Sequence, residues 1–211
     1  MNYPKMSKDK VQAALAEGRT HLEFMASLYR KQILRGKYFL HEHPATALSW
    51  KEDAILQLSK LPSVYTTVAD QCMYGLTSPT GAKGSDRLPS MKPTRFMTNS
   101  IHMQEKLSTR CDRSHKHQQL VGGRCADAAF YPLGLVKAIL SGMQATTQAD
   151  QLQDQLHEER KALLAAITDS AGKIPVEADP DVGPPSSVKR VAGGILPVGY
   201  HPHNFCAKYV D

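Results

Sequence analysis

The sequence predicts a small α/β domain with a mostly parallel sheet. Stretches with apolar residues at helical spacing alternate with short runs rich in β-branched and aromatic residues. This alternation is typical of parallel strands joined by right-handed helical crossovers. We expect three parts: an α/β domain over residues 1–145, an amphipathic helix over 146–169, and a Pro/Gly-rich linker or disordered tail over 170–211.

Each element of the predicted domain has its own sequence signal. We expect helices at 8–35, 101–111 and 127–143, and strands at 37–40, 64–68, 95–98 and 118–121. Ser49 has Glu52 three positions later, which is a capping-box pattern for a further helix, and Ser100 is a second candidate N-cap. Glycine, proline, serine and threonine punctuate residues 75–92, so this stretch is predicted to be a loop.

The first candidate site follows the first predicted strand. The apolar run Tyr38–Leu40 is followed directly by His41, Glu42 and His43. In open α/β sheets, ligand chemistry takes place at the carboxyl ends of strands. A carboxylate flanked by two imidazoles could act there as a general acid or base. The alternative is that Glu42 caps the following turn and that both histidines are solvated.

A second candidate site combines cysteine and histidine. Cys111, His115 and His117 form a C-x3-H-x-H cluster, and Cys72 could complete a tetrahedral zinc site. The alternative is a buried thiol near exposed histidines, because zinc sites usually show two close ligand pairs. Zinc is the only cofactor that the sequence suggests, since it has no GxGxxG, P-loop or GxSxG motif.

Positive charge is concentrated in the middle of the chain. Residues 83–124 carry nine basic and three acidic side chains, which accounts for the whole net charge of +6. Such a segment can be an electrostatic footprint for DNA or RNA, and the alternative is a solvated basic face. The candidate contacts are Lys92, Arg95, Arg110, Arg113 and Lys116. The first two flank the start of a predicted strand and could also hold a phosphate.

The chain is expected to be intracellular, in the nucleus or the cytoplasm. Its first residues, MNYPKMSKDK, lack the apolar core of a secretory signal. No apolar run approaches the roughly 20 residues of a membrane span, so we expect no membrane partner. Four cysteines without a CxxC pair are consistent with free thiols in a reducing compartment.

Two resemblances follow from the order of these motifs. HEHP, DQCMYG and KPTRFMTN resemble the later half of the cytosine-5 DNA methyltransferases. In that family the Glu of a Glu-Asn-Val motif contacts the target cytosine, and Glu42 matches it, whereas His43 stands where the family has Asn. GKYFLHEHPATALSW, CDRSHKHQQLVGG and AAFYP more closely resemble a methyltransferase-like segment of copia-type retrotransposon polyproteins. Cys111, His115 and His117 belong to that second resemblance.

The resemblances imply a truncated, partial Rossmann-like methyltransferase half flanked by helices. The nucleophile and the methyl-donor motif of the family are expected upstream of this chain. The resemblances thus imply a non-catalytic fragment of a mobile-element polyprotein, with the remainder of the polyprotein as a partner, and the charge of residues 83–124 predicts that this fragment binds DNA or RNA. The alternatives are a methyltransferase-like enzyme half with Glu42 as acid or base, and a zinc-stabilised module.

Overall fold

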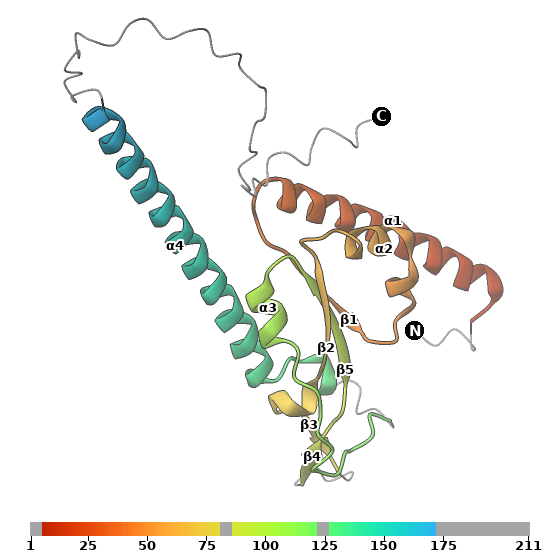
Figure 1. Ribbon diagram of the computed structural model, residues 1–211. Coiled ribbons are helices and arrows are strands. Elements are labelled where there is room, and N and C mark those ends of the chain that lie inside the picture. Colours follow the sequence, from red (N-terminus) through yellow and green to blue (C-terminus); the bar gives the residue numbers. More distant parts are fainter. Residues whose placement is uncertain (1–5, 81–85, 122–126, 172–211) are drawn as a thin grey trace, which may run out of the picture. The chain divides into compact units, whose positions relative to one another are not determined.

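The computed structural model describes residues 6–80, 86–121 and 127–171 (Figure 1). One compact unit extends to Leu163, and a second unit begins at Leu164. The described part of the second unit is the end of helix α4. Most of the predicted C-terminal tail, from residue 172 on, lies outside the described residues.

The central sheet has three strands in the order β1-β5-β2. These strands are β1 (Leu40–Pro44), β5 (Pro93–Thr98) and β2 (Tyr65–Asp70). The central strand β5 is antiparallel to both neighbours. A separate two-stranded antiparallel ladder pairs β3 (Thr77–Pro79) with β4 (Arg87–Pro89), inside the segment that was predicted to be a loop.

The prediction of a mostly parallel, partial Rossmann-like sheet is wrong. β1 and β2 do run in the same direction, as a strand-helix-strand order suggests. However, β5 lies between them and runs the opposite way, so each pair of neighbours is antiparallel. Periodicity identifies a strand but not its neighbours. The fourth expected strand, at 118–121, has no strand structure in the described chain.

Helices cover both faces of the sheet (Figure 1). α1 (Lys8–Leu34) and α2 (Asp53–Ser59) lie on one face, and α3 (Ile101–Lys106) and the start of α4 (Leu133–Ala171) lie on the other. Adjacent residues of a strand point to opposite faces. Met97 therefore packs in the core under α1 and α2, whereas Phe96 packs in the core under α3 and α4.

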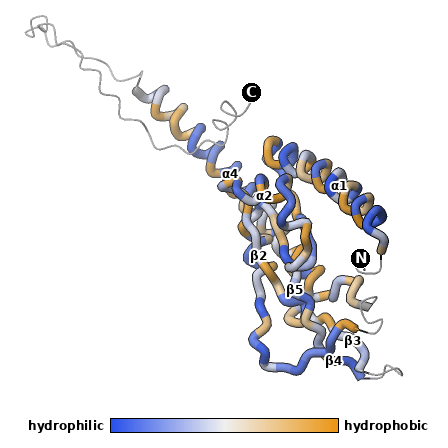
Figure 2. Tube along the Cα trace, turned by 90° about the vertical axis from the view of Figure 1, so that its right-hand side faces the viewer, coloured by the Kyte–Doolittle hydropathy of each residue, from blue (hydrophilic) through white to orange (hydrophobic). Residues whose placement is uncertain are grey.

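The long helices differ in how they use their apolar residues. The predicted helix at 8–35 is confirmed as α1, which alternates between hydrophilic and hydrophobic residues (Figure 2) and buries Leu22, Ala26 and Tyr29. The two helical segments expected at 127–143 and 146–169 join into one unbroken helix, α4, which begins only at Leu133, after a separate 3-10 turn at Asp127–Ala129. None of the helices in the described ranges is long and apolar enough to cross a membrane.

Two predicted helix starts have different outcomes. Ser100 caps α3 as predicted, because its Oγ accepts the backbone N–H of Met103 at 3.2 Å, although α3 ends at Lys106 rather than at residue 111. The predicted capping box is wrong. Ser49 lies inside a 3-10 turn, and Glu52 itself occupies the N-cap position of α2.

Candidate metal centre

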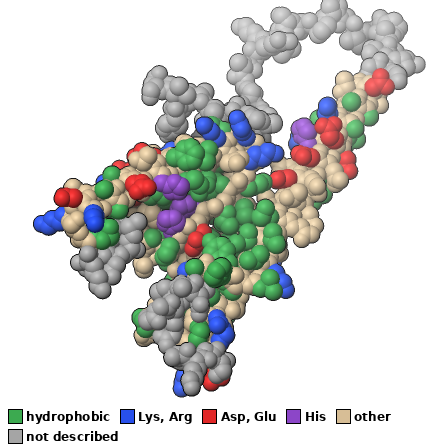
Figure 3. Space-filling view, turned by 180° about the vertical axis from the view of Figure 1, so that it is seen from behind, with side chains coloured by type: hydrophobic (Ala, Val, Ile, Leu, Met, Phe, Trp, Pro, Cys, Tyr) green, Lys and Arg blue, Asp and Glu red, His purple; other side chains and the backbone are tan. Residues whose placement is uncertain are grey.

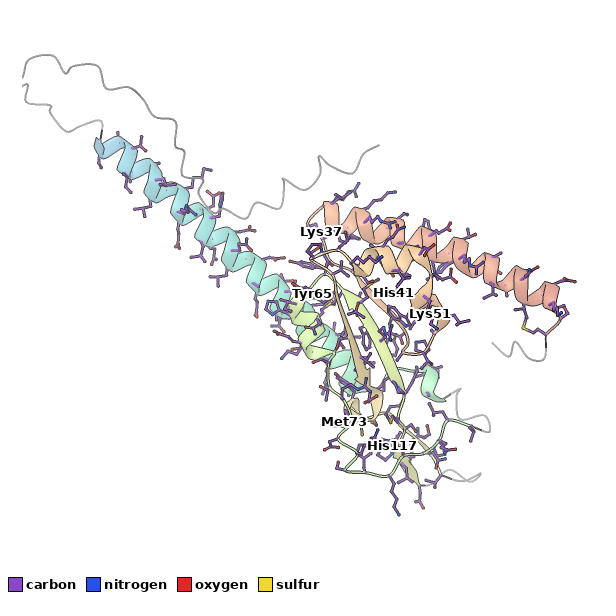
Figure 4. The ribbon with its side chains drawn as sticks, turned by 45° about the vertical axis from the view of Figure 1, so that its right-hand side comes forward. Lys37, His41, Lys51, Tyr65, Met73 and His117 are labelled. Atoms are coloured by element: carbon purple, nitrogen blue, oxygen red, sulfur yellow. The ribbon has the colours of Figure 1, made fainter. Side chains whose placement is uncertain are left out.

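Four side chains converge at one end of the sheet to form a possible metal site. The ligand atoms of Cys72, Cys111, His115 and His117 all lie within 4.8 Å of one another. Figure 4 shows the same end of the molecule, where Met73 lies near His117 and far from His41. The predicted metal set is therefore brought together in the fold, although Cys72 is distant from the other three in sequence.

A tight turn after β2 positions Cys72. The 3-10 helix η3 (Gln71–Tyr74) follows the strand directly. Gly75 ends it with a φ of 90°, and its N–H bonds back to the carbonyls of Gln71 and Cys72. Glycine adopts this left-handed conformation without a steric cost. The turn leaves the Cys72 side chain buried, with 8% exposure.

Asp70 and Tyr74 hold the second segment against that turn. The buried Asp70 carboxylate accepts a hydrogen bond from the backbone N–H of Cys111 at 2.9 Å. It also forms an ion pair with the Arg110 guanidinium at 3.0 Å. The Tyr74 hydroxyl donates to the carbonyl of Lys106 at 2.9 Å and accepts the N–H of Thr109 at 3.2 Å. The backbone before Cys111 is thus tied to residues on both sides of Cys72.

A local turn brings the two histidines back towards Cys111. Arg113 has a left-handed φ of 62°, and its N–H donates to the Cys111 sulfur at 3.3 Å. Asp112 accepts the N–H of Ser114 at 3.0 Å, a bond that lowers the pKa of the Asp112 carboxyl. Beyond the histidines, Gln118 donates its N–H to the carbonyl of Pro89 at 2.8 Å, which anchors the far end of the segment.

The distances in this cluster fit a tetrahedral metal ion. Zinc bonds to thiolate sulfur at about 2.3 Å and to imidazole nitrogen at about 2.0 Å, so ligand atoms in a tetrahedral site lie about 3.3 to 3.8 Å apart. The Cys111 sulfur lies 3.4 Å from Nε2 of His117 and 3.7 Å from Nε2 of His115. The longest separation in the set, at most 4.8 Å, would shorten by about 1 Å on binding.

Protonation of the Cys72 thiol opposes metal binding. Burial is the main cause that raises the pKa of Cys72 to about 11, and the hydrogen bond and charge of Cys111 raise it further. Without a metal, Cys72 therefore keeps its proton at neutral pH. A metal ion must displace that proton, because the thiolate is the form that binds metals.

The other predicted site is not brought together in the same way. His41 and Glu42 are adjacent in β1, so they point to opposite faces of the sheet. Glu42 accepts a hydrogen bond at 2.8 Å from the Tyr131 hydroxyl, whereas His41 packs in the layer beneath α1 against Tyr29. Glu42 therefore lies mid-strand and is not enclosed by two imidazoles.

The two histidines of β1 have structural partners. The His41 and His43 rings stack at 4.9 Å, and His43 is hydrogen-bonded through Nδ1 to Ser49 at 2.6 Å. Burial is the main cause that lowers the pKa of His41 to about 4, with smaller contributions from His43 and His21. His41 is thus uncharged at neutral pH. The cavity lined by α1 and the start of α2 does not include either histidine or Glu42.

The five predicted nucleic-acid contacts fall into two groups. Arg110, Arg113 and Lys116 are exposed and lie in the segment that carries three of the candidate metal ligands. The side chains at the start of β5 have other partners: the Lys92 ammonium donates to the carbonyl of Ala128 at 2.9 Å, and the Arg95 guanidinium lies 5.2 Å from the centre of the Trp50 ring. On the face shown in Figure 3, basic side chains lie in several separate groups.

Sequence reasoning missed the residues that support the candidate metal ligands. Asp70, Tyr74 and the left-handed Arg113 contact the ligands or the backbone beside them. An acidic residue directly before QCMYG was a usable signal for Asp70. The role of Tyr74 had no signal, because it depends on contacts with residues more than 30 positions away.

Comparison with known proteins adds no relative of this chain. No family model, curated protein or solved structure matches it. The resemblance to the retrotransposon polyproteins therefore rests on the sequence motifs quoted above.

Proposed function

We propose that this chain is a non-catalytic, zinc-binding module in which the metal joins the end of β2 to the irregular segment between α3 and α4. The observation that carries the proposal is the convergence of Cys72, Cys111, His115 and His117. Four protein ligands complete the tetrahedral coordination of a zinc ion and leave no position for a substrate. Closed sites of this kind are structural rather than catalytic.

The donor atoms favour zinc over the common hard cations. Two thiolates and two imidazoles are the Cys2His2 set of structural zinc sites, whereas magnesium and calcium prefer oxygen ligands. Residues 107–121 form no helix or strand in the described chain. A metal ion would therefore supply order to this segment that secondary structure does not supply.

Elemental analysis of the purified, reduced protein tests the proposal directly. We expect one zinc ion per chain, lost together with thermal stability when a strong chelator is added. We also expect Co²⁺ to give the thiolate charge-transfer absorption of a tetrahedral cysteine site. A folded, metal-free protein that takes up neither zinc nor cobalt would overturn the proposal.

Substitution of single ligands makes the test specific to the four residues. Cys111→Ser and His117→Ala should each lower zinc content and affinity, because three protein ligands remain. His102→Ala is the matched control, since His102 is a partly exposed histidine on α3 outside the cluster. Equal zinc binding by all three variants would place the metal elsewhere.

A second candidate function is binding of DNA or RNA by the metal-held segment. The supporting observation is that Arg110, Arg113 and Lys116 are exposed among the metal ligands, so a metal that orders the loop would also order its charges. We expect fluorescence anisotropy to show binding at low salt. For duplex DNA, a plot of the logarithm of the binding constant against the logarithm of the salt concentration has a negative slope. Arg113→Gln and Lys116→Gln should each reduce the magnitude of this slope by about one unit.

The control for that experiment is Lys60→Gln, which removes an exposed lysine at the end of α2. The absence of binding at low salt, or an equal effect of Lys60→Gln, would overturn this second function. The catalytic role of Glu42 and the membership in a retrotransposon polyprotein remain predictions. For the first, Glu42→Gln should abolish any activity that is found, and an unchanged rate would reject the role.

A further inference from the structure

We propose that Cys72 and Cys111 form a redox switch in the metal site: a peroxide oxidises the two thiolates to a disulfide and the metal is released. The inference rests on the proposed zinc function and adds a form of regulation to it. Both cysteines are free, and their sulfur atoms lie within 4.8 Å of each other. They belong to two segments that are far apart in sequence, so their bond would join these segments in place of the metal.

The geometry allows the two sulfurs to meet. A disulfide bond is about 2.05 Å long, so the sulfurs must approach by less than about 3 Å. Cys72 is held in a 3-10 turn that Gly75 closes. Cys111 lies inside the irregular segment 107–121, two residues before the left-handed Arg113. Such a stretch can move by this distance without breaking a helix or strand.

Exposure assigns different roles to the two thiolates. Cys111 is partly exposed and Cys72 is buried, so a peroxide reaches Cys111 first. The Cys111 sulfur attacks one peroxide oxygen, the O–O bond breaks, and the leaving hydroxide takes a proton to form water. The Cys72 thiolate then attacks the resulting sulfenic sulfur, the S–S bond forms, the S–O bond breaks, and a second hydroxide is protonated to water. The two sulfurs together lose two electrons, which the peroxide gains.

Loss of the metal follows from the composition of the ligand set. After oxidation only His115 and His117 remain as donors, because a disulfide does not bind zinc as thiolates do. Two imidazoles are half of a tetrahedral set. A site with three imidazoles and one thiolate would keep three ligands after oxidation of its thiolate. This centre keeps only two of its four ligands, which makes it sensitive to oxidation.

The experiment uses the full chain with Cys125→Ser and Cys206→Ser, which removes the other two cysteines. The reduced, zinc-loaded protein is treated with hydrogen peroxide. Released zinc is followed with a chromogenic chelator, and the cross-link is mapped by mass spectrometry of unreduced peptides. We expect one zinc released for each two thiols lost, a peptide pair joined through Cys72 and Cys111, and recovery of zinc binding after dithiothreitol treatment.

Cys111→Asp in the same background is the matched variant, because a carboxylate can ligate zinc but cannot form a disulfide. It should bind zinc more weakly than the parent protein, and peroxide should release this zinc more slowly than it releases zinc from the parent protein. If that variant does not fold, the presence or absence of the Cys72–Cys111 cross-link in the parent protein still tests the redox switch. A zinc-loaded protein that keeps its metal, or loses thiols without the Cys72–Cys111 cross-link, overturns the redox switch alone. A reduced protein that binds no zinc overturns the proposed function itself.

Discussion

Protonation of His41 should make the fold lose stability in acid, and His41→Gln should remove that loss. The imidazole is 5% exposed and hydrogen-bonded to Tyr29 at 3.1 Å. Its Nε2 atom has no hydrogen-bond partner among the residues that the structure describes. Glutamine can still bond to Tyr29 but does not titrate, so the variant isolates the charge from the packing.

The magnitude follows from the pKa of His41 in the two states. The pKa falls from 6.5 in the unfolded chain to about 4 in the fold, mainly because burial disfavours the charged ring. The unfolded state therefore binds more protons between these values, and stability is complete above about pH 6.5 and falls as the pH is lowered towards 4. Between pH 7.5 and 4.5 this amounts to about 2 to 3 kcal/mol.

Urea unfolding of both proteins at the two pH values measures this quantity. Wild type should lose about 2 to 3 kcal/mol more than His41→Gln. Titrating groups other than His41 are the same in both proteins and cancel in the difference. His102→Gln is the control, since His102 is partly exposed and should follow wild type. Equal losses in wild type and His41→Gln would refute the assignment of His41 as a buried, neutral residue.

Two further predictions concern packing and support of the metal centre. Gly142→Ala should destabilise the fold by about 1 to 3 kcal/mol, because its new Cβ would lie 2.8 Å from the Cα of Met103. Gly18→Ala should stabilise the fold by up to about 1 kcal/mol, because no atom lies within 4 Å of its new Cβ. Similar shifts in the melting temperatures of the two variants would contradict this reasoning. Asp70→Asn should weaken zinc affinity by about tenfold in a chelator competition, because it disturbs the bond to the Cys111 N–H; unchanged affinity would reject this role.

Local patterns were sufficient for parts of the fold and of the site. The apolar spacing of residues 8–35 predicted α1, and the β-branched run at 64–68 predicted most of β2. The metal cluster was also partly local, since Cys111, His115 and His117 are close in sequence. In each case the pattern that carries the prediction lies within one continuous stretch of sequence. There the spacing of the side chains alone determines which of them face the same way.

The capping box at Ser49 shows where local reasoning fails. The pattern Ser-x-x-Glu was present, but the Ser49 hydroxyl bonds to the His43 ring instead. The same limitation applies to Glu42, whose partner Tyr131 lies 89 positions away. A short polar side chain takes whichever partner the tertiary structure places near it, so a local motif describes one of several possible bonds.

By itself, the sequence determined helix α1, most of strand β2 and which three candidate metal ligands cluster on one short segment. The tertiary structure decided that β5 lies between β1 and β2 and makes the sheet antiparallel. It also decided that Cys72 reaches Cys111 and that Glu42 and His41 face opposite layers. The physical reason is that periodicity encodes the environment of each side chain, whereas strand neighbours and distant ligands depend on which buried surfaces fit together.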